Sequence, residues 1–135
     1  MRLWHYKLLP YLPKGQLLSQ KRECDLIWKD IENGKQTNHI LINYIWEYKD
    51  YIKELYTYYF LLEKEFKNRK FKFNYHWGCK SRNKNENLVP FKNNHNDHYL
   101  IQCFYNLQEK YDRGQKDFSE EEYKKLDSFV FNELF

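Results

Sequence analysis

Apolar and aromatic side chains recur at three- and four-residue steps over residues 47–69, and this pattern constrains the fold more than any other feature of the chain. Steps of three and four place side chains on one side of an α-helix, whereas a half-buried strand alternates at every second residue. The segment is therefore predicted to be a long helix with one broad apolar face. The residues on that face are Tyr48, Tyr51, Ile52, Leu55, Tyr59, Leu62 and Phe66.

Three further segments have helical spacing and recognisable ends. Residues 16–30 are followed by an Asn-Gly turn, and residues 97–111 are followed by Gly114, which suits a helix C-terminus. The last helix is expected to begin after Ser119, because Ser119 and Glu122 have the spacing of a capping box. Two short apolar runs are ambiguous. LLPYL and HILINYIW are candidate strands, and the second is equally a candidate for a buried helical turn.

A chain of 135 residues is long enough for one hydrophobic core. We therefore expect an all-α fold, with a single compact domain over residues 1–135. It is predicted to contain about four helices, with a long basic connection between the second and the third.

Charge is unevenly distributed along the chain, whose net charge is +4. Residues 64–84 carry eight basic side chains and one acidic side chain, whereas residues 117–135 carry six acidic and two basic ones. A basic middle suits a surface that follows a phosphate backbone, and a solvated loop is the alternative. The candidate phosphate contacts are Lys67, Arg69, Lys70, Lys72, Lys80, Arg82 and Lys84, with Trp77 as a candidate stacking residue.

The cysteines predict neither a disulfide framework nor a zinc site, because Cys24, Cys79 and Cys103 are scattered and no CxxC pair occurs. The first residues lack the apolar stretch of a signal peptide, and no run is long enough to span a membrane. We therefore expect a cytoplasmic protein without membrane association or metal. His95 and His98 have the spacing of a metal pair, but a loop followed by a helix start is the favoured interpretation.

The stretch LLSQKREC places Arg22 next to Glu23 on the first predicted helix. Adjacent residues on a helix do not face each other, so the two form no internal pair. By itself the pair indicates a solvated helix face. Its interpretation changes when the N-terminal residues Met1 and Arg2 are considered with it.

Together, MRLWH at the N-terminus and QLLSQKRE over residues 16–23 resemble the pyrimidine-dimer DNA glycosylase family, the phage endonuclease V type. Members of that family have an arginine next to the N-terminal residue and an Arg-Glu pair on the first helix. The resemblance covers residues 1–75, including the basic ending KNRKFKFN of the second helix. It looks closest to a bacterial branch whose members start with MRLWH.

The resemblance implies a DNA repair glycosylase with AP-lyase activity, which acts on double-stranded damaged DNA without a cofactor. In the family, the α-amino group of the chain attacks C1′ of deoxyribose, displaces the damaged base and forms a Schiff base. β-Elimination then nicks the strand. The resemblance makes Met1 the nucleophile, with Glu23 as the acid/base residue. The implied DNA contacts are Arg2 and Arg22, to which the basic connection adds Lys80, Arg82 and Lys84.

These residue types suit the chemistry. An α-amino group has a reference pKa of about 7.7–8.0, against about 10.4 for lysine, so a useful fraction is neutral at pH 7. Nearby arginines favour the neutral form, and a carboxylate stabilises positive charge at C1′ and moves protons. We expect Met1 to be retained, because Arg2 is too large to permit its removal.

The chain departs from the family pattern in three places. Gln16 stands where the phage proteins have His, and Leu26 stands where they have Arg. The aromatic, Lys-containing tail that helps to recognise the dimer is replaced by an acidic helix. The alternative function is therefore a non-catalytic nucleic-acid or protein interaction module on the same fold. In either case we expect a monomer.

Overall fold

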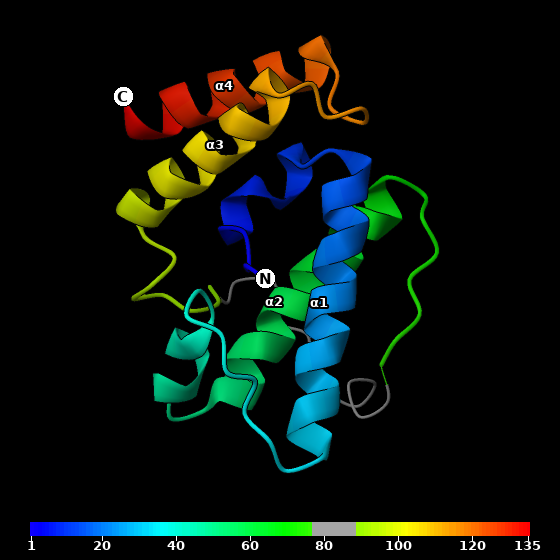
Figure 1. Ribbon diagram of the computed structural model, residues 1–135, viewed down its shortest axis with the longest axis vertical. Coiled ribbons are helices and arrows are strands. Elements are labelled where there is room, and N and C mark those ends of the chain that lie inside the picture. The colour runs from blue at the N-terminus through cyan, green and yellow to red at the C-terminus, as the bar shows by residue number, and fades with distance from the viewer. Residues whose placement is uncertain (77–88) are drawn as a thin grey trace.

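The computed structural model describes residues 1–76 and 89–135. Within these residues, α-helices and 3₁₀-helices form the fold and no strand is present (Figure 1). The all-α prediction is confirmed. The elements are η1 (Tyr6–Tyr11), α1 (Lys14–Glu32), η2 (Asn43–Glu47), α2 (Tyr51–Asn68), α3 (Asp97–Asp112) and α4 (Glu120–Leu134), where η denotes a 3₁₀-helix.

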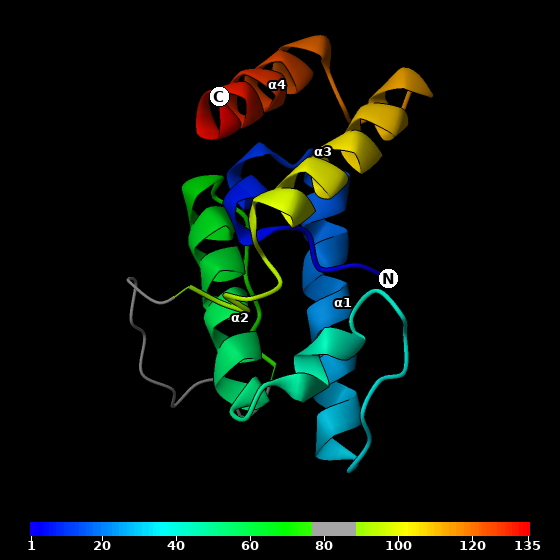
Figure 2. The ribbon, with the colours of Figure 1, turned by 90° about the vertical axis from the view of Figure 1, so that its left-hand side faces the viewer.

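The α-helices form two pairs. α1 packs against α2, and α3 and α4 lie together across one end of that first pair (Figure 1, Figure 2). η1 lies between the two pairs, in contact with both α2 and α4. Its Leu8 and Leu9 are fully buried, so the N-terminal segment belongs to the core. Within the described part of the chain, no helix is long and apolar enough to cross a membrane.

The apolar stripe of the second predicted helix is buried in α2, where Leu55, Tyr59 and Leu62 are inaccessible to solvent. The prediction started this helix at residue 47, but α2 starts at Tyr51. The reason is local, because the Asp50 side chain accepts a hydrogen bond from the backbone N–H of Lys53 (3.3 Å) and fixes the helix start.

The two ambiguous apolar runs are 3₁₀-helices in the structure. LLPYL lies mostly in η1, and HILINYIW contributes most of η2, so the strand interpretation was wrong for both. The alternative of a buried helical turn is confirmed for the second run. Ile42 and Ile45 are the side chains through which it enters the core.

The predicted capping box is present at the start of α4. The Ser119 hydroxyl accepts a hydrogen bond from the Glu122 N–H (3.1 Å), and the Glu122 carboxylate accepts one from the Ser119 N–H (3.1 Å). The two residues thereby satisfy backbone donors that a helix start leaves without partners.

The start of α1 is capped from the other half of the chain. The carboxylate of Asp117, in the turn between α3 and α4, accepts a hydrogen bond from the backbone N–H of Gly15. A side chain at Gly15 would collide with this carboxylate, which accounts for the glycine. The second Asp117 oxygen accepts from the Gln115 side-chain amide (2.8 Å). The C-terminal half therefore holds the N-terminus of α1.

Candidate active site

A buried glutamine on α1 fixes the N-terminal segment. Gln20 is 1% exposed, and both ends of its amide make hydrogen bonds. Its Oε1 accepts from the backbone N–H of Trp4 (2.6 Å) and from the Tyr58 hydroxyl (2.7 Å). Its Nε2 donates to the backbone carbonyl of Arg2 (2.8 Å). The chain directly after Met1 is therefore held against α1.

Glu23 lies one turn after Gln20 and is half-buried. Its Oε2 accepts a hydrogen bond from Gln20 Nε2 (2.9 Å) and a longer one from the backbone N–H of Arg2 (3.4 Å). Burial raises the pKa of Glu23, while the Arg2 N–H and the positive N-terminal amine partly offset the rise. The carboxylate is therefore fixed in orientation next to the N-terminus.

The α-amino group of Met1 lies 3.5 Å from Nε2 of His39. His39 belongs to the loop between α1 and η2, which passes beside the N-terminus in Figure 2. Its Nδ1 accepts a hydrogen bond from the Leu41 N–H (3.2 Å), and its own backbone N–H donates to Asn43 Oδ1 (2.9 Å). These contacts fix the imidazole ring at the amine.

Met1 and Glu23 line one pocket of about 260 Å³, the amine pocket. α3 contributes Asn106 and Lys110 to its wall, although they lie far along the chain from Met1 and Glu23. The N-terminal segment, α1, the loop before η2 and α3 thus form the pocket together. The residues that line it are Met1, Arg2, Trp4, Gln16, Glu23, Leu41, Asn106 and Lys110.

The two arginines predicted to contact DNA have different surroundings. Arg2 lines the pocket, and its guanidinium carbon lies 5.8 Å from the ring centres of Trp4 and Tyr99. Arg22 is exposed and donates a hydrogen bond to the Ser19 hydroxyl (2.9 Å). The structure therefore brings Arg2 together with the amine and leaves Arg22 on the open surface of α1.

The candidate phosphate contacts of residues 67–84 lie only in part within the described residues. Lys80, Arg82 and Lys84, together with Trp77, lie outside the described residues, so their role stays a prediction.

Arg69, one of the candidate phosphate contacts, makes hydrogen bonds within the fold. It donates to the Glu65 carboxylate (3.0 Å) and to the backbone carbonyls of Leu9 (3.3 Å) and Pro10 (3.1 Å). It therefore joins the end of α2 to η1 instead of presenting a free guanidinium to a phosphate.

His95 and His98 do not form a pair. His95 is 4% exposed, and its Nδ1 accepts a hydrogen bond from the Tyr6 N–H (3.2 Å). Its Nε2 lies 2.8 Å from the Tyr44 hydroxyl, whereas His98 is exposed. Among the described residues, no three His, Cys, Asp or Glu side chains gather as a metal site would need. His95 is a hydrogen-bonded core residue.

Four polar residues around Met1 and Glu23 were not predicted from the sequence, namely Gln20, His39, Asn106 and Lys110. Gln20 carried a usable signal, because it lies three residues before Glu23 and so on the same helix face. His39 contacts the Met1 amine from a loop, whereas Asn106 and Lys110 line the pocket from α3. Local sequence patterns do not mark such contacts.

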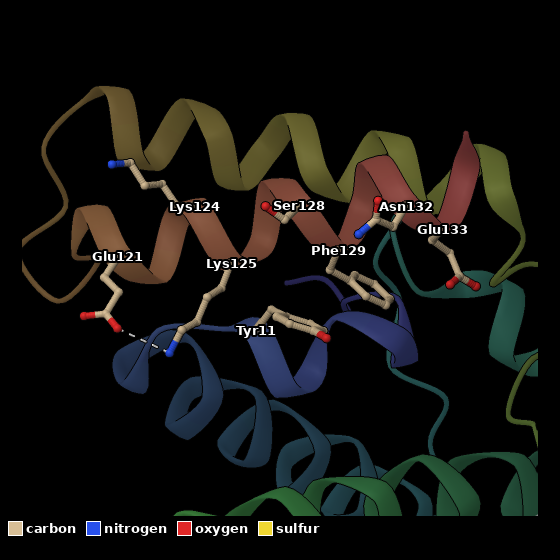
Figure 3. A pocket seen from close by; sticks show the side chains of 8 residues that line it. All are labelled: Tyr11, Glu121, Lys124, Lys125, Ser128, Phe129, Asn132 and Glu133. Carbon is tan, nitrogen blue, oxygen red and sulfur yellow. Dashed lines mark ion pairs between the residues drawn. The ribbon is translucent and has the colours of Figure 1, made fainter.

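A second groove, of about 520 Å³, lies between η1 and α4 (Figure 3). Tyr11 and Phe129 stack in it with ring centres 4.4 Å apart, and Lys125 forms an ion pair with Glu121 (3.5 Å). It shares no lining residue with the amine pocket. Because Met1 and Glu23, the nucleophile and the acid/base residue of the predicted chemistry, both line the amine pocket, that pocket is the candidate active site.

The fold and the pocket define an all-α protein with its N-terminal amine beside a half-buried carboxylate. A family model described as pyrimidine dimer DNA glycosylase matches residues 1–79, which is more than half of the chain. The chain therefore belongs to the pyrimidine dimer DNA glycosylase family, and the predicted resemblance is confirmed. Membership implies damaged DNA as the substrate. No curated protein and no solved structure matches the chain significantly.

The family match includes α1 and α2 but ends before α3. Asn106 and Lys110 therefore come from a part of the chain that the family model does not cover, although they line the same pocket as Met1 and Glu23.

Proposed function

We propose that the protein is a DNA glycosylase with AP-lyase activity, in which the Met1 amine is the nucleophile and Glu23 the acid/base residue. The observation that supports this assignment is that the amine and the carboxylate line one pocket. The family match supports damaged duplex DNA as the substrate. The proposed site of action is the cytoplasm, on DNA of the nucleoid, with one monomeric domain per lesion.

The reaction begins when the lone pair of the Met1 nitrogen forms a bond to C1′ of the damaged nucleotide. The glycosidic bond breaks, and its electron pair leaves with the base, which takes a proton from water. Glu23 accepts the proton that the nitrogen gives up and returns it to O4′ when the sugar ring opens. A protonated imine remains. The hydroxide left when water protonated the base takes a C2′ proton. The electrons of that C–H bond form a C2′–C3′ double bond, and the C3′–O bond breaks with its electron pair leaving on the 3′ phosphate, which nicks the strand.

The surroundings of Glu23 suit this double use. A group that both accepts and returns a proton works best when its pKa is near the working pH. Burial raises the pKa of Glu23 in that direction, and the Gln20 amide holds the carboxylate in place.

Positive side chains at the pocket suit a nucleic-acid substrate. Arg2 and Lys110 line it, and both are able to contact phosphates that flank a flipped nucleotide. Arg22 would contact the strand from the open face of α1. The further proposed DNA contacts are Lys80, Arg82 and Lys84.

Borohydride trapping on an abasic-site duplex tests the proposal. Hydride adds to the carbon of the imine, so the reduced product is a covalent protein–DNA adduct. We expect peptide mapping to locate it on Met1. Lys110 is the informative alternative, because its amine lines the same pocket. An adduct on Lys110, or no adduct, would contradict the assignment of Met1.

A second candidate is a non-catalytic interaction module, favoured by the three consecutive glutamates in the first turn of α4. One added glycine before Met1 separates the two functions. It displaces the amine from the pocket, so an enzyme loses trapping, whereas a binding module keeps its affinity for DNA.

A further inference from the structure

We propose that His39 is a further catalytic residue, which stabilises the neutral form of the Met1 amine relative to the ammonium form by donating a hydrogen bond to the nitrogen lone pair. The catalytic part of this inference rests on the proposed function, because only there is the amine the nucleophile. The hydrogen bond itself rests on the geometry of the loop before η2.

The hydrogen bonds of the ring determine where its hydrogen lies. Nδ1 of His39 accepts from the Leu41 N–H (3.2 Å), so Nδ1 carries no hydrogen. A neutral imidazole has one N–H, and it must therefore be on Nε2. Nε2 is the atom that lies 3.5 Å from the Met1 nitrogen. The ring consequently presents a donor to the amine.

A donor at this position discriminates between the two forms of the amine. A neutral amine has a lone pair that accepts the Nε2–H. An ammonium group has only donors, so its hydrogens would face the Nε2–H without an acceptor between them. The contact therefore favours the form of the amine that attacks C1′.

The ring is held in place by the turn around it. The backbone carbonyl of His39 accepts hydrogen bonds from the N–H groups of Ile42 and Asn43, both at 2.9 Å. The Asn43 side chain returns a hydrogen bond to the His39 N–H (2.9 Å). A reorientation of the imidazole away from Met1 would lose the Leu41 contact.

Three charged groups line the same pocket as Met1. They are the Glu23 carboxylate on α1, the Arg2 guanidinium in the N-terminal segment and the Lys110 ammonium group on α3. His39 differs from these three because it acts on the lone pair directly. It also leaves proton removal to Glu23, since its Nε2 already carries a hydrogen.

Carbamoylation by cyanate measures this effect without DNA, because cyanate reacts with neutral amines. The rate at Met1 is followed by peptide mass against pH in the wild type and in His39→Leu. One hydrogen bond corresponds to an equilibrium factor of about two to ten, so we expect the variant to react about two- to tenfold more slowly at neutral pH. Its pH profile should move to higher pH.

Two further variants make the comparison specific. His39→Gln offers an amide N–H at a similar reach and should recover part of the rate. His98→Leu removes an exposed imidazole on α3 and should behave like the wild type. The ring nitrogen shifts of wild-type His39 in an NMR spectrum should show hydrogen on Nε2. Superimposable profiles of the wild type and His39→Leu, or hydrogen on Nδ1, would overturn the inference.

Borohydride trapping of the same proteins separates this inference from the proposed function. If the wild type forms no adduct while carbamoylation depends on His39, the proposed function fails and the hydrogen bond to the amine stands. If the wild type forms the adduct and His39→Leu forms it at the same rate across the pH range, His39 is not catalytic and the proposed function stands.

Discussion

At the scale of single residues, Gln20 links the N-terminal segment to the Glu23 carboxylate by hydrogen bonds. A side-chain amide offers two donor hydrogens and two acceptor lone pairs. Gln20 uses them on Trp4, Tyr58, Arg2 and Glu23, which belong to three different segments. No other side chain of this size offers the same combination. This one amide therefore connects the N-terminal segment, α2 and the Glu23 carboxylate.

Glu23→Gln is expected to abolish strand nicking while DNA binding and folding persist. The change keeps the shape of the side chain, so the free energy of unfolding should change by less than about 1 kcal/mol. Loss of acid/base assistance should lower the nicking rate by roughly 10²–10⁴. Single-turnover nicking of an abasic duplex measures the rate, and Glu47→Gln on the exposed face of η2 is the matched control. Wild-type nicking by Glu23→Gln would make the carboxylate a surface charge only.

The buried His5 makes the free energy of unfolding depend on pH. Burial lowers the pKa of His5 from 6.5 to about 4. As the pH falls, His5 of the unfolded chain therefore binds a proton near pH 6.5, whereas His5 of the folded chain binds one only near pH 4. The contribution of the neutral His5 to the free energy of unfolding is therefore fully present above pH 6.5 and is lost as the pH falls. The loss should reach about 2 kcal/mol near pH 5.

Urea denaturation across this pH range measures the effect. His5→Asn keeps an acceptor for the Lys7 N–H and should flatten the pH dependence, whereas the exposed His98→Asn should not. Part of the dependence should survive in His5→Asn, because burial also holds the pKa of His95 well below its usual range. An unchanged slope in His5→Asn would contradict this account.

At the scale of elements, other segments hold α1 at two places, its first turn and the turn that carries Gln20 and Glu23. Its first turn is capped by Asp117, and the turn that carries Gln20 and Glu23 is tied to the N-terminal segment. No side chain at its own N-cap position, Pro13, makes a capping hydrogen bond. The helix that carries Glu23 therefore depends on the turn between α3 and α4.

Asp117→Ala should destabilise the protein by about 1–2 kcal/mol, because it removes both a cap and a negative charge at a helix N-terminus. Asp127→Ala, on the exposed face of α4, is the control and should be nearly neutral. Hydrogen exchange should also show faster opening of the first turn of α1. Equal stability of the two variants would mean that water replaces the cap without cost.

Elements that are formed by interactions between residues close in sequence were predictable, and contacts between residues distant in sequence were not. The stripe of α2 and the capping box of α4 are local patterns, and both were predicted. η1 and η2 were not resolved, because a short apolar run fits a strand and a helical turn alike. In the site, Met1, Arg2 and Glu23 were found through a resemblance. His39 contacts Met1, and Lys110 lines the pocket, through contacts between segments distant in sequence, which periodicity does not report.

At the scale of the whole molecule, positively charged side chains line the amine pocket and acidic side chains lie on α4. Arg2 and Lys110 contribute cations at the pocket, while α4 and the groove beside it carry acidic side chains that are paired in part with Lys124 and Lys125. A duplex bound at the pocket would therefore be favoured over one bound along α4.

The triple substitution of Lys80, Arg82 and Lys84 by alanine should weaken binding to all DNA sequences alike. Each phosphate contact releases condensed counterions and contributes about −0.9 to the slope of log K against log salt, so the slope should flatten by up to about three. Fluorescence anisotropy at several salt concentrations measures it. Lys124→Ala with Lys125→Ala is the control. An unchanged slope in the triple variant would identify residues 80–84 as solvated surface.

The wall that α3 contributes to the amine pocket has a consequence during translation. The first residue leaves the ribosome long before Asn106 and Lys110 have been added, and at about 5–20 residues per second the interval lasts for seconds. Throughout it the nascent chain carries its amine without the α3 wall or the Asp117 cap of α1. The pocket is complete only once α3 has been made, so a chain that stalls before α3 presents the amine without the site around it.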